Sequence, residues 1–206
     1  MTVAIEGRMG ETILTELEVE PRLQLIEVVR DTRTLDGRIP LYKDAEISVK
    51  SFDPEDLYPT AKYVLTANLQ FVSTMREELL NSDGVDILGL NQIFANHIYV
   101  VAPPVVEISD GVPAIVDGLH RCSLARNLGE KISVIFVNGV DSRYPIISIP
   151  IGWEEVVEYQ TKPEVANLLR NVRPGIQDEG GSLRKFYRDY SYLGSVGRRP
   201  RQGQTG

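Results

Sequence analysis

The 206-residue sequence is poor in the residues that build disulfides and zinc sites. It contains one cysteine, Cys122, and two histidines, His97 and His120. A single cysteine excludes a disulfide within the chain, and it leaves no cysteine cage for zinc. We read His97, which has no partner motif, as structural. The chemistry of this protein should depend on neither disulfides nor zinc.

Long hydrophobic runs and excess positive charge are also missing. No apolar run approaches the roughly 20 residues that span a bilayer, and the N-terminus lacks the basic and apolar regions of a secretory signal. The net charge of −7 argues against a general nucleic-acid-binding surface, which must neutralise phosphates. Basic residues do gather from Arg184 onwards. We therefore expect a cytoplasmic protein without a membrane partner and with a local basic patch.

The composition is that of an ordinary globular protein, with 42% hydrophobic and 25% charged residues. Partial alternation of apolar and polar residues over 12–20 and 22–29 predicts strands. The predicted fold class is α+β with a mixed sheet. It comprises a β-rich N-terminal extension (1–44), a core (45–140), a helical C-terminal addition (141–194) and a flexible basic tail (195–206).

Periodicity places the main elements of the core. Residues 45–52 predict a strand, the apolar spacing from Thr60 to about Leu80 predicts a helix, and a second short helix is expected over 86–97. Asp110-Gly111 between two apolar runs predicts a hairpin. The nearly continuous apolar run 131–139 predicts a strand buried on both faces.

The stretch IVDGLHRCSLARNLG, residues 115–129, concentrates the chemistry. An apolar strand runs through Asp117-Gly118 into a helix, whose first turn exposes unpaired N–H groups and the positive end of its dipole. Gly118 permits a tight turn and close approach of a ligand. His120, Arg121 and Ser123 add hydrogen-bonding groups, and a guanidinium binds two phosphate oxygens at once. The stretch favours a phosphate site, and a helix capped by Asp117 with solvated cations is the alternative.

This stretch resembles the signature of the ParB/sulfiredoxin superfamily. Its pattern I-V-D-G-x-H-R, Ile115 to Arg121, is most similar to the free L-serine kinase branch. Upstream, ISVKSFDPEDLYP (47–59) resembles the opening strand of the superfamily and its Leu-x-Pro loop. The resemblance covers about residues 45–140.

The resemblance implies a ParB/sulfiredoxin-like fold whose strand-turn-helix cradles the phosphates of ATP or ADP. The implied nucleotide-binding residues are Gly118, Leu119, His120, Arg121, Cys122 (through its backbone) and Ser123. Asp117 is implied as a catalytic residue that organises Mg²⁺ or handles a proton, with His120 beside it. The acceptor would be a small hydroxyl compound such as a serine-like substrate.

Departures from the branch patterns discriminate among functions. Sulfiredoxins carry a nucleophilic cysteine where this chain has Leu119, and ParB partition proteins carry a second arginine where it has His120. The serine kinases place a catalytic glutamate where this chain has Ala61. Glu55 or Asp56, in the acidic loop that begins at Asp53, could act as the catalytic carboxylate instead. The alternative for this loop is a solvated cap of the following helix.

Two functions follow. The first is a small-molecule kinase that uses ATP or ADP with Mg²⁺. The alternative is a non-catalytic, nucleotide-responsive ParB-like module that binds DNA or a protein partner through its basic C-terminus. Two further features stay open. Trp153 is a packing anchor or a pocket wall, and the basic-aromatic run 183–194 is a closing helix or a platform for stacking bases.

Overall fold

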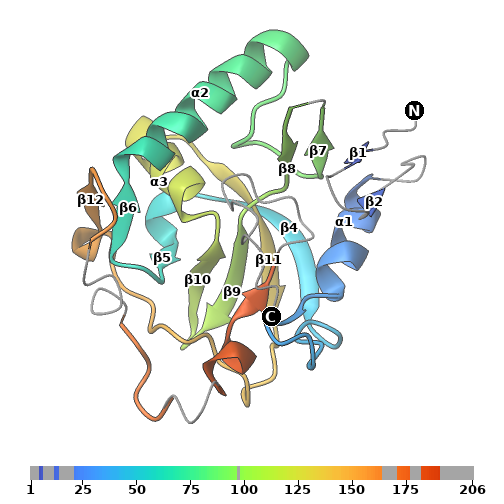
Figure 1. Ribbon diagram of the computed structural model, residues 1–206, viewed down its shortest axis with the longest axis vertical. Helices are drawn as coiled ribbons and strands as arrows, with labels where there is room; N and C mark the ends of the chain where they lie inside the picture. Colours follow the sequence, from blue (N-terminus) through green and yellow to red (C-terminus); the bar gives the residue numbers. More distant parts are fainter. Residues whose placement is uncertain are drawn as a thin grey trace, which may run out of the picture.

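A five-stranded mixed sheet forms the centre of the computed structural model (Figure 1). The structure describes residues 5–6, 12–13, 21–96, 98–163, 171–176 and 182–190. The order of the strands is β4 (Glu46–Phe52), β11 (Ile132–Asn138), β9 (Val105–Ser109), β10 (Val112–Asp117) and β5 (Tyr58–Pro59). β4–β11 and β9–β10 are antiparallel, whereas β11–β9 and β10–β5 are parallel. The predicted α+β class with a mixed sheet is confirmed.

Helices cover both faces of this sheet. Ile132 and Val134 of β11 pack in a core with α2 (Thr66–Asp83) and α3 (Leu119–Leu128). Ile135 and Val137, which point to the opposite face, pack with α1 (Pro21–Arg30). Figure 1 shows α2 and α3 on one side of the sheet and α1 on the other. The prediction that β11 is buried on both faces is therefore confirmed.

Turn chemistry places two elements where the sequence predicts them. Asp110 and Gly111 have φ of 54° and 82°, the left-handed conformations that a tight hairpin between β9 and β10 requires. α3 ends at Leu128 because Gly129 adopts the left-handed C-cap conformation, with φ of 66°.

Two predicted helices differ from the structure. α2 begins at Thr66 and not at Thr60, because Tyr63–Leu65 form β6, which pairs with β12 (Val157–Tyr159). The short helix expected over 86–97 is absent from the described residues of that range. Asp86 there accepts a hydrogen bond from the Leu88 N–H at 2.9 Å and pairs with Arg76, and the chain continues into β7 (Phe94–Ala95) and β8 (Val100–Val101).

Within the described residues of the predicted N-terminal extension, one of the two expected strands is a helix. Residues 22–29 lie in α1, since Leu25 and Val29, four residues apart, bury one helical face against the sheet. The strands here are short: β1 (Ile5–Glu6) pairs with β2 (Thr12–Ile13), and β3 (Arg33–Thr34) pairs with β13 (Arg188–Asp189).

Within the described residues of the predicted C-terminal addition, the helical elements are the 3-10 helices η2 (Trp153–Glu155) and η3 (Ser182–Phe186), and the strands are β12 and β13. A further 3-10 helix, η1 (Pro54–Asp56), lies in the acidic loop. Residues 164–170 and the predicted tail 195–206 lie outside the described residues.

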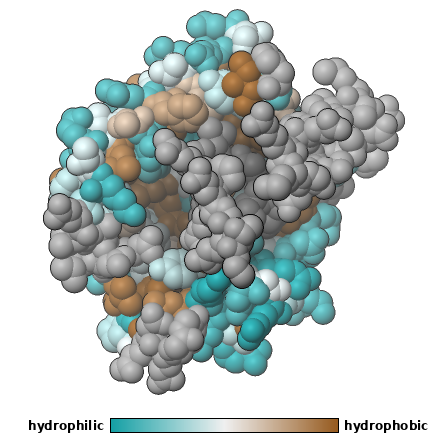
Figure 2. Space-filling model, viewed as in Figure 1, coloured by the Kyte–Doolittle hydropathy of each residue, from teal (hydrophilic) through white to brown (hydrophobic). Residues whose placement is uncertain are grey.

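None of the helices in the described residues has the length and hydropathy of a membrane span. On the face in Figure 2, the lower right of the molecule is hydrophilic, where the loops between α1 and β4 lie in Figure 1.

Candidate functional site

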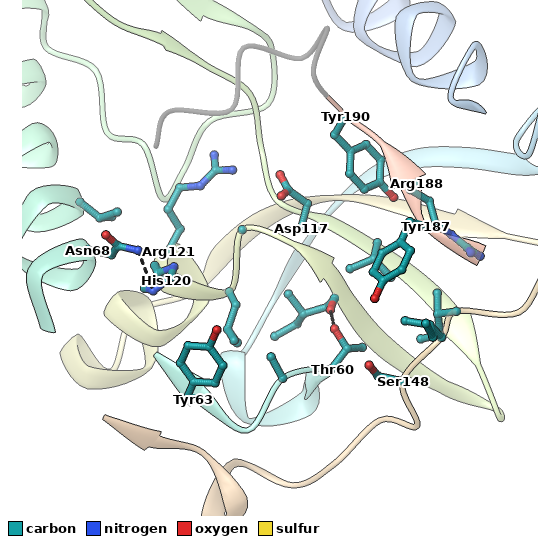
Figure 3. Close-up of a pocket in the computed structure, with 18 of the residues that line it drawn as sticks. Thr60, Tyr63, Asn68, Asp117, His120, Arg121, Ser148, Tyr187, Arg188 and Tyr190 are labelled. Carbon is teal, nitrogen blue, oxygen red and sulfur yellow. Dashed lines mark hydrogen bonds between the residues drawn. The ribbon is translucent and has the colours of Figure 1, made fainter. Parts of the chain in front are cut away.

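A cavity of about 440 Å³ lies where β10 ends and α3 begins. Its walls come from residues within 60–72, 115–121, 146–148 and 186–190. Asp117, Gly118, Leu119, His120 and Arg121 all line it (Figure 3). The structure therefore brings the first half of the predicted phosphate motif to one cavity of a size that suits a small-molecule ligand.

The turn at Gly118 accepts no other residue without strain. Its φ of 83° is left-handed, and a Cβ there would lie 2.6 Å from the Cβ of Pro104. The amides of Arg121 and Cys122 donate to the Gly118 carbonyl at 3.0 and 3.1 Å, which are the first hydrogen bonds of α3. The N–H groups of Leu119 and His120 precede those bonds, so they form the positive end of the helix at the cavity.

His120 connects α3 to the start of α2. Its Nε2 accepts a hydrogen bond from the Leu65 N–H at 3.2 Å and lies 3.4 Å from the Asn68 amide nitrogen. Burial lowers the pKa of His120, although the negative charge of Asp117 opposes that effect. We infer from the accepting Nε2 that the imidazole is neutral, with its proton on Nδ1. His120 is thus a hydrogen-bonding group of the cavity and not a cation.

Arg121 is a buried cation for which the described residues supply one hydrogen-bond acceptor, a backbone carbonyl. The side chain is only 9% exposed, and its guanidinium donates a hydrogen bond to the Ala102 carbonyl. Burial lowers the pKa of Arg121, and the charge of Asp117 opposes this. Within the described residues, no carboxylate lies at salt-bridge distance from Arg121. A buried charge of this kind is costly unless an anion accompanies it.

The opposite side of the cavity holds a second buried arginine, Arg188, which is fully paired. Its Nε and one terminal nitrogen donate to the two Glu107 carboxylate oxygens, each at 2.7 Å. Tyr42 donates to the same carboxylate and shares a hydrogen bond with Tyr190. Burial alone would lower the pKa of Arg188, but the charge and hydrogen bonds of Glu107 raise it. This cluster ties the C-terminal segment to β9.

Several residues of the predicted site lie elsewhere. The Ser123 hydroxyl donates to the Leu119 carbonyl at 2.9 Å and lines a separate small cavity. The Cys122 amide, which was the predicted contact, donates to the Gly118 carbonyl at 3.1 Å; the side chain is buried in the core, where burial raises the pKa of the thiol to about 12. Glu55 pairs with Arg126 at 2.8 Å, and neither Glu55 nor Asp56 lines the main cavity. Their placement gives no support to a catalytic role.

The structure places the acidic loop and Trp153, and the basic-aromatic run 183–194 contributes to η3 and β13 within its described residues, 183–190. Asp53 accepts from the Glu55 N–H at 3.1 Å and caps η1, so the acidic loop caps a helix, although not α2. Trp153 is buried and donates to the Pro54 carbonyl at 2.8 Å, so it anchors the packing there; it lines the small cavity at Ser123 and not the main one.

Sequence reasoning missed most of the far wall of the cavity. That wall includes Thr60, Ser148, Tyr187 and Tyr190. The basic-aromatic run 183–194 was a usable signal for Tyr187 and Tyr190. No local pattern marks Ser148, which reaches the cavity only because its loop crosses the end of the sheet.

Comparison with known proteins establishes the family. A model described as the ParB CE domain matches residues 24–157, more than half of the chain, so this chain belongs to that family. The chain is also similar to two solved structures. The C2221 form of a Pnob8-like ParB-N domain shares 13% identity over 49% of this chain and 33% of its own, with a TM-score of 0.25.

A second solved structure, the pNOB8-like ParB N-domain, shares 17% identity over 48% of this chain and 30% of its own, with a TM-score of 0.25. The chain thus spans about a third of the length of these solved chains. No curated protein matches it. The ParB part of the sequence resemblance is confirmed by the family match.

Proposed function

We propose that this domain binds the phosphates of ATP or ADP at the start of α3 and transfers a phosphoryl group to the hydroxyl of a small acceptor. The observation that carries the proposal is Arg121, a buried cation with a carbonyl partner, which lines the cavity beside the N-terminal amides of α3. A phosphate would supply the missing anion and would accept hydrogen bonds from those amides.

Asp117 would take the role of the catalytic carboxylate. It is the single acidic residue among those that line the cavity in the described part of the chain. No group of three metal-binding side chains occurs in the described residues. A single carboxylate, Asp117, suits Mg²⁺, which proteins often bind through one or two carboxylates together with substrate phosphates. Mg²⁺ held by Asp117 would neutralise charge on the transferred group, as phosphoryl transfer requires.

His120 and Asp117 would then act on the acceptor by position. The neutral His120 can donate a hydrogen bond from Nδ1 while Nε2 stays fixed to Leu65. Asp117 can accept the hydroxyl proton of the acceptor. A nucleotide substrate and the one cysteine, which is free and buried, both suit the cytoplasm.

One observation favours the second candidate, a nucleotide-responsive module without turnover. Ala61 lines the cavity, at the position where the kinase resemblance expects a glutamate, and the nearby acids Glu55 and Asp56 do not line it. Asp117 is then the one carboxylate available to both the metal and the acceptor. In that case ligand binding would change the affinity for DNA or a protein partner.

The experiment that separates the two candidates measures binding and turnover in the same protein. Calorimetry with ATP, ADP, CTP and GTP in Mg²⁺ tests binding, and a ligand at 100 times its Kd should stabilise the fold by about 2.7 kcal/mol. Turnover is then measured with a panel of small alcohols, serine included. We expect Asp117→Asn to abolish turnover and to retain nucleotide binding. Binding without turnover for every acceptor supports the module, and absence of binding by every nucleotide contradicts both.

A further inference from the structure

The C-terminal segment Phe186–Tyr190 forms one wall of the cavity. It lies outside the residues that match the family, 24–157. Figure 3 shows Tyr187 and Tyr190 on one side of the cavity, with Thr60 and Ser148 near the Tyr187 hydroxyl and Asp117 above. This wall of the cavity therefore comes from a part of the chain outside the family match.

Buried contacts hold that wall in place. Arg188 pairs with Glu107, which is 2% exposed, and also donates to the Phe186 and Tyr144 carbonyls at 2.8 and 2.9 Å. The Leu35 N–H donates to the Tyr187 carbonyl at 2.9 Å. These contacts fix the backbone at and next to Tyr187, which lines the cavity.

The chemistry of this end of the cavity differs from that of the phosphate end. Ile146, Ile147, Ser148 and Tyr187 line it, and none of them carries a charge at neutral pH. The nearby charges of Arg188 and Glu107 neutralise each other. Ser148 is 4% exposed and lines the cavity, so its hydroxyl offers an uncharged hydrogen-bonding group. A charged ligand group would be desolvated here without a partner.

We infer that Tyr187 and Ser148 bind the uncharged base of the nucleotide, and that Tyr187 sets the preference for a nucleotide over free polyphosphate. This inference rests on the proposed phosphate site at α3. An aromatic ring provides a stacking surface for any base, and a buried hydroxyl can hydrogen-bond to the edge of the base. A zwitterionic acceptor such as serine would instead require charged partners at this end.

The test compares ATP with inorganic tripolyphosphate, which lacks the base. Calorimetry in Mg²⁺ gives Kd for both ligands with the wild type, Tyr187→Ala, Tyr187→Phe and Ser148→Ala. Tyr58→Ala is the matched control, since Tyr58 is exposed and does not line the cavity. We expect Tyr187→Ala to raise the Kd for ATP about tenfold. Tyr187→Phe keeps the ring and should change the Kd for ATP little. The Kd for tripolyphosphate should be the same in all variants.

The outcomes separate this inference from the proposed function. If the wild type binds neither ligand, the phosphate site itself is wrong. If the wild type binds both but Tyr187→Ala weakens them equally or not at all, only the base assignment is overturned. If Tyr187→Ala raises the KM for the acceptor and leaves the Kd for ATP unchanged, the base assignment is also overturned. Melting temperatures report folding, and if Tyr187→Ala is unfolded, a selective loss of ATP affinity in Ser148→Ala decides the question.

Discussion

Two buried arginines line the same cavity and differ in one respect. Arg188 is 7% exposed and gives its guanidinium to the carboxylate of Glu107, whereas Arg121 is 9% exposed and donates to a backbone carbonyl. In Figure 3 they lie on opposite sides of Asp117. A cation whose partners are complete joins parts of the fold, whereas Arg121 has no carboxylate at salt-bridge distance among the described residues, and an anionic ligand would complete its pairing. Under the proposed function, the contrast would distinguish the structural side of the cavity from its binding side.

The two environments also act differently on the charged state. Burial lowers the pKa of Arg121, while Glu107 more than offsets the same effect at Arg188 and raises the pKa there. The fold therefore stabilises the charge of Arg188 by itself. At Arg121 the remaining stabilisation would come from a bound phosphate.

The largest expected effect is on stability at the paired arginine. Arg188→Met leaves the Glu107 carboxylate buried without its cation and should lower the free energy of unfolding by about 3–5 kcal/mol. Urea denaturation measures it. Arg143→Met is the control, because Arg143 forms its ion pair with Asp141 on the surface and such pairs contribute about 0–1 kcal/mol. A loss below about 1 kcal/mol at Arg188 would contradict the structural role.

The next effect is on binding at the incompletely paired arginine. Arg121→Met retains most of the apolar stem but removes the charge-assisted hydrogen bonds, so the Kd for ATP should rise at least about tenfold. The free energy of unfolding should fall by about 1–3 kcal/mol, less than in Arg188→Met, because the Ala102 carbonyl loses its donor but no carboxylate is stranded. If Arg121→Met destabilises the protein as much as Arg188→Met does, the two arginines are both structural and the comparison fails.

The smallest expected effect is a dependence of the free energy of unfolding on pH, caused by His120 of the cavity. Because burial lowers the pKa of His120, the folded protein binds fewer protons than the unfolded chain below the usual pKa of about 6.5. The contribution of the neutral His120 to the free energy of unfolding should therefore be fully present above about pH 6.5. It should fall as the pH drops towards the lowered pKa, where the His120 ring gains a proton and loses its hydrogen bond from Leu65.

Urea denaturation between pH 5 and pH 8 tests this dependence. His120→Gln should flatten the dependence of the free energy of unfolding on pH. Equal slopes in the wild type and His120→Gln would show that the ring does not titrate in this way.

Local patterns predicted the elements whose geometry depends on neighbouring residues. The Asp110-Gly111 hairpin, the turn at Gly118 and the end of α3 at Gly129 follow from left-handed φ angles. Residues 22–29 were misread because their apolar residues fit both a strand and a helix, and only burial of Leu25 and Val29 against the sheet decides between the two. The start of α2 was misplaced because β6 depends on a partner strand about ninety residues later.

The candidate site divides in the same way. The motif from Asp117 to Arg121 was visible in the sequence, because its residues are adjacent and a helix start brings their backbone to one place. The placement of Glu55 away from the cavity was not visible, since it depends on its ion pair with Arg126 of α3. Ser123 lies on α3 itself, and its hydroxyl bonds to the Leu119 carbonyl and lines a separate cavity.

By itself the sequence determined that a strand, a glycine turn and a helix would present Asp117, His120 and Arg121 together, because backbone angles and helical spacing act over a few residues. Only the tertiary structure decided which arginine is paired. Arg188 meets Glu107 across 81 residues of chain, and a contact over that distance depends on how the whole sheet is assembled.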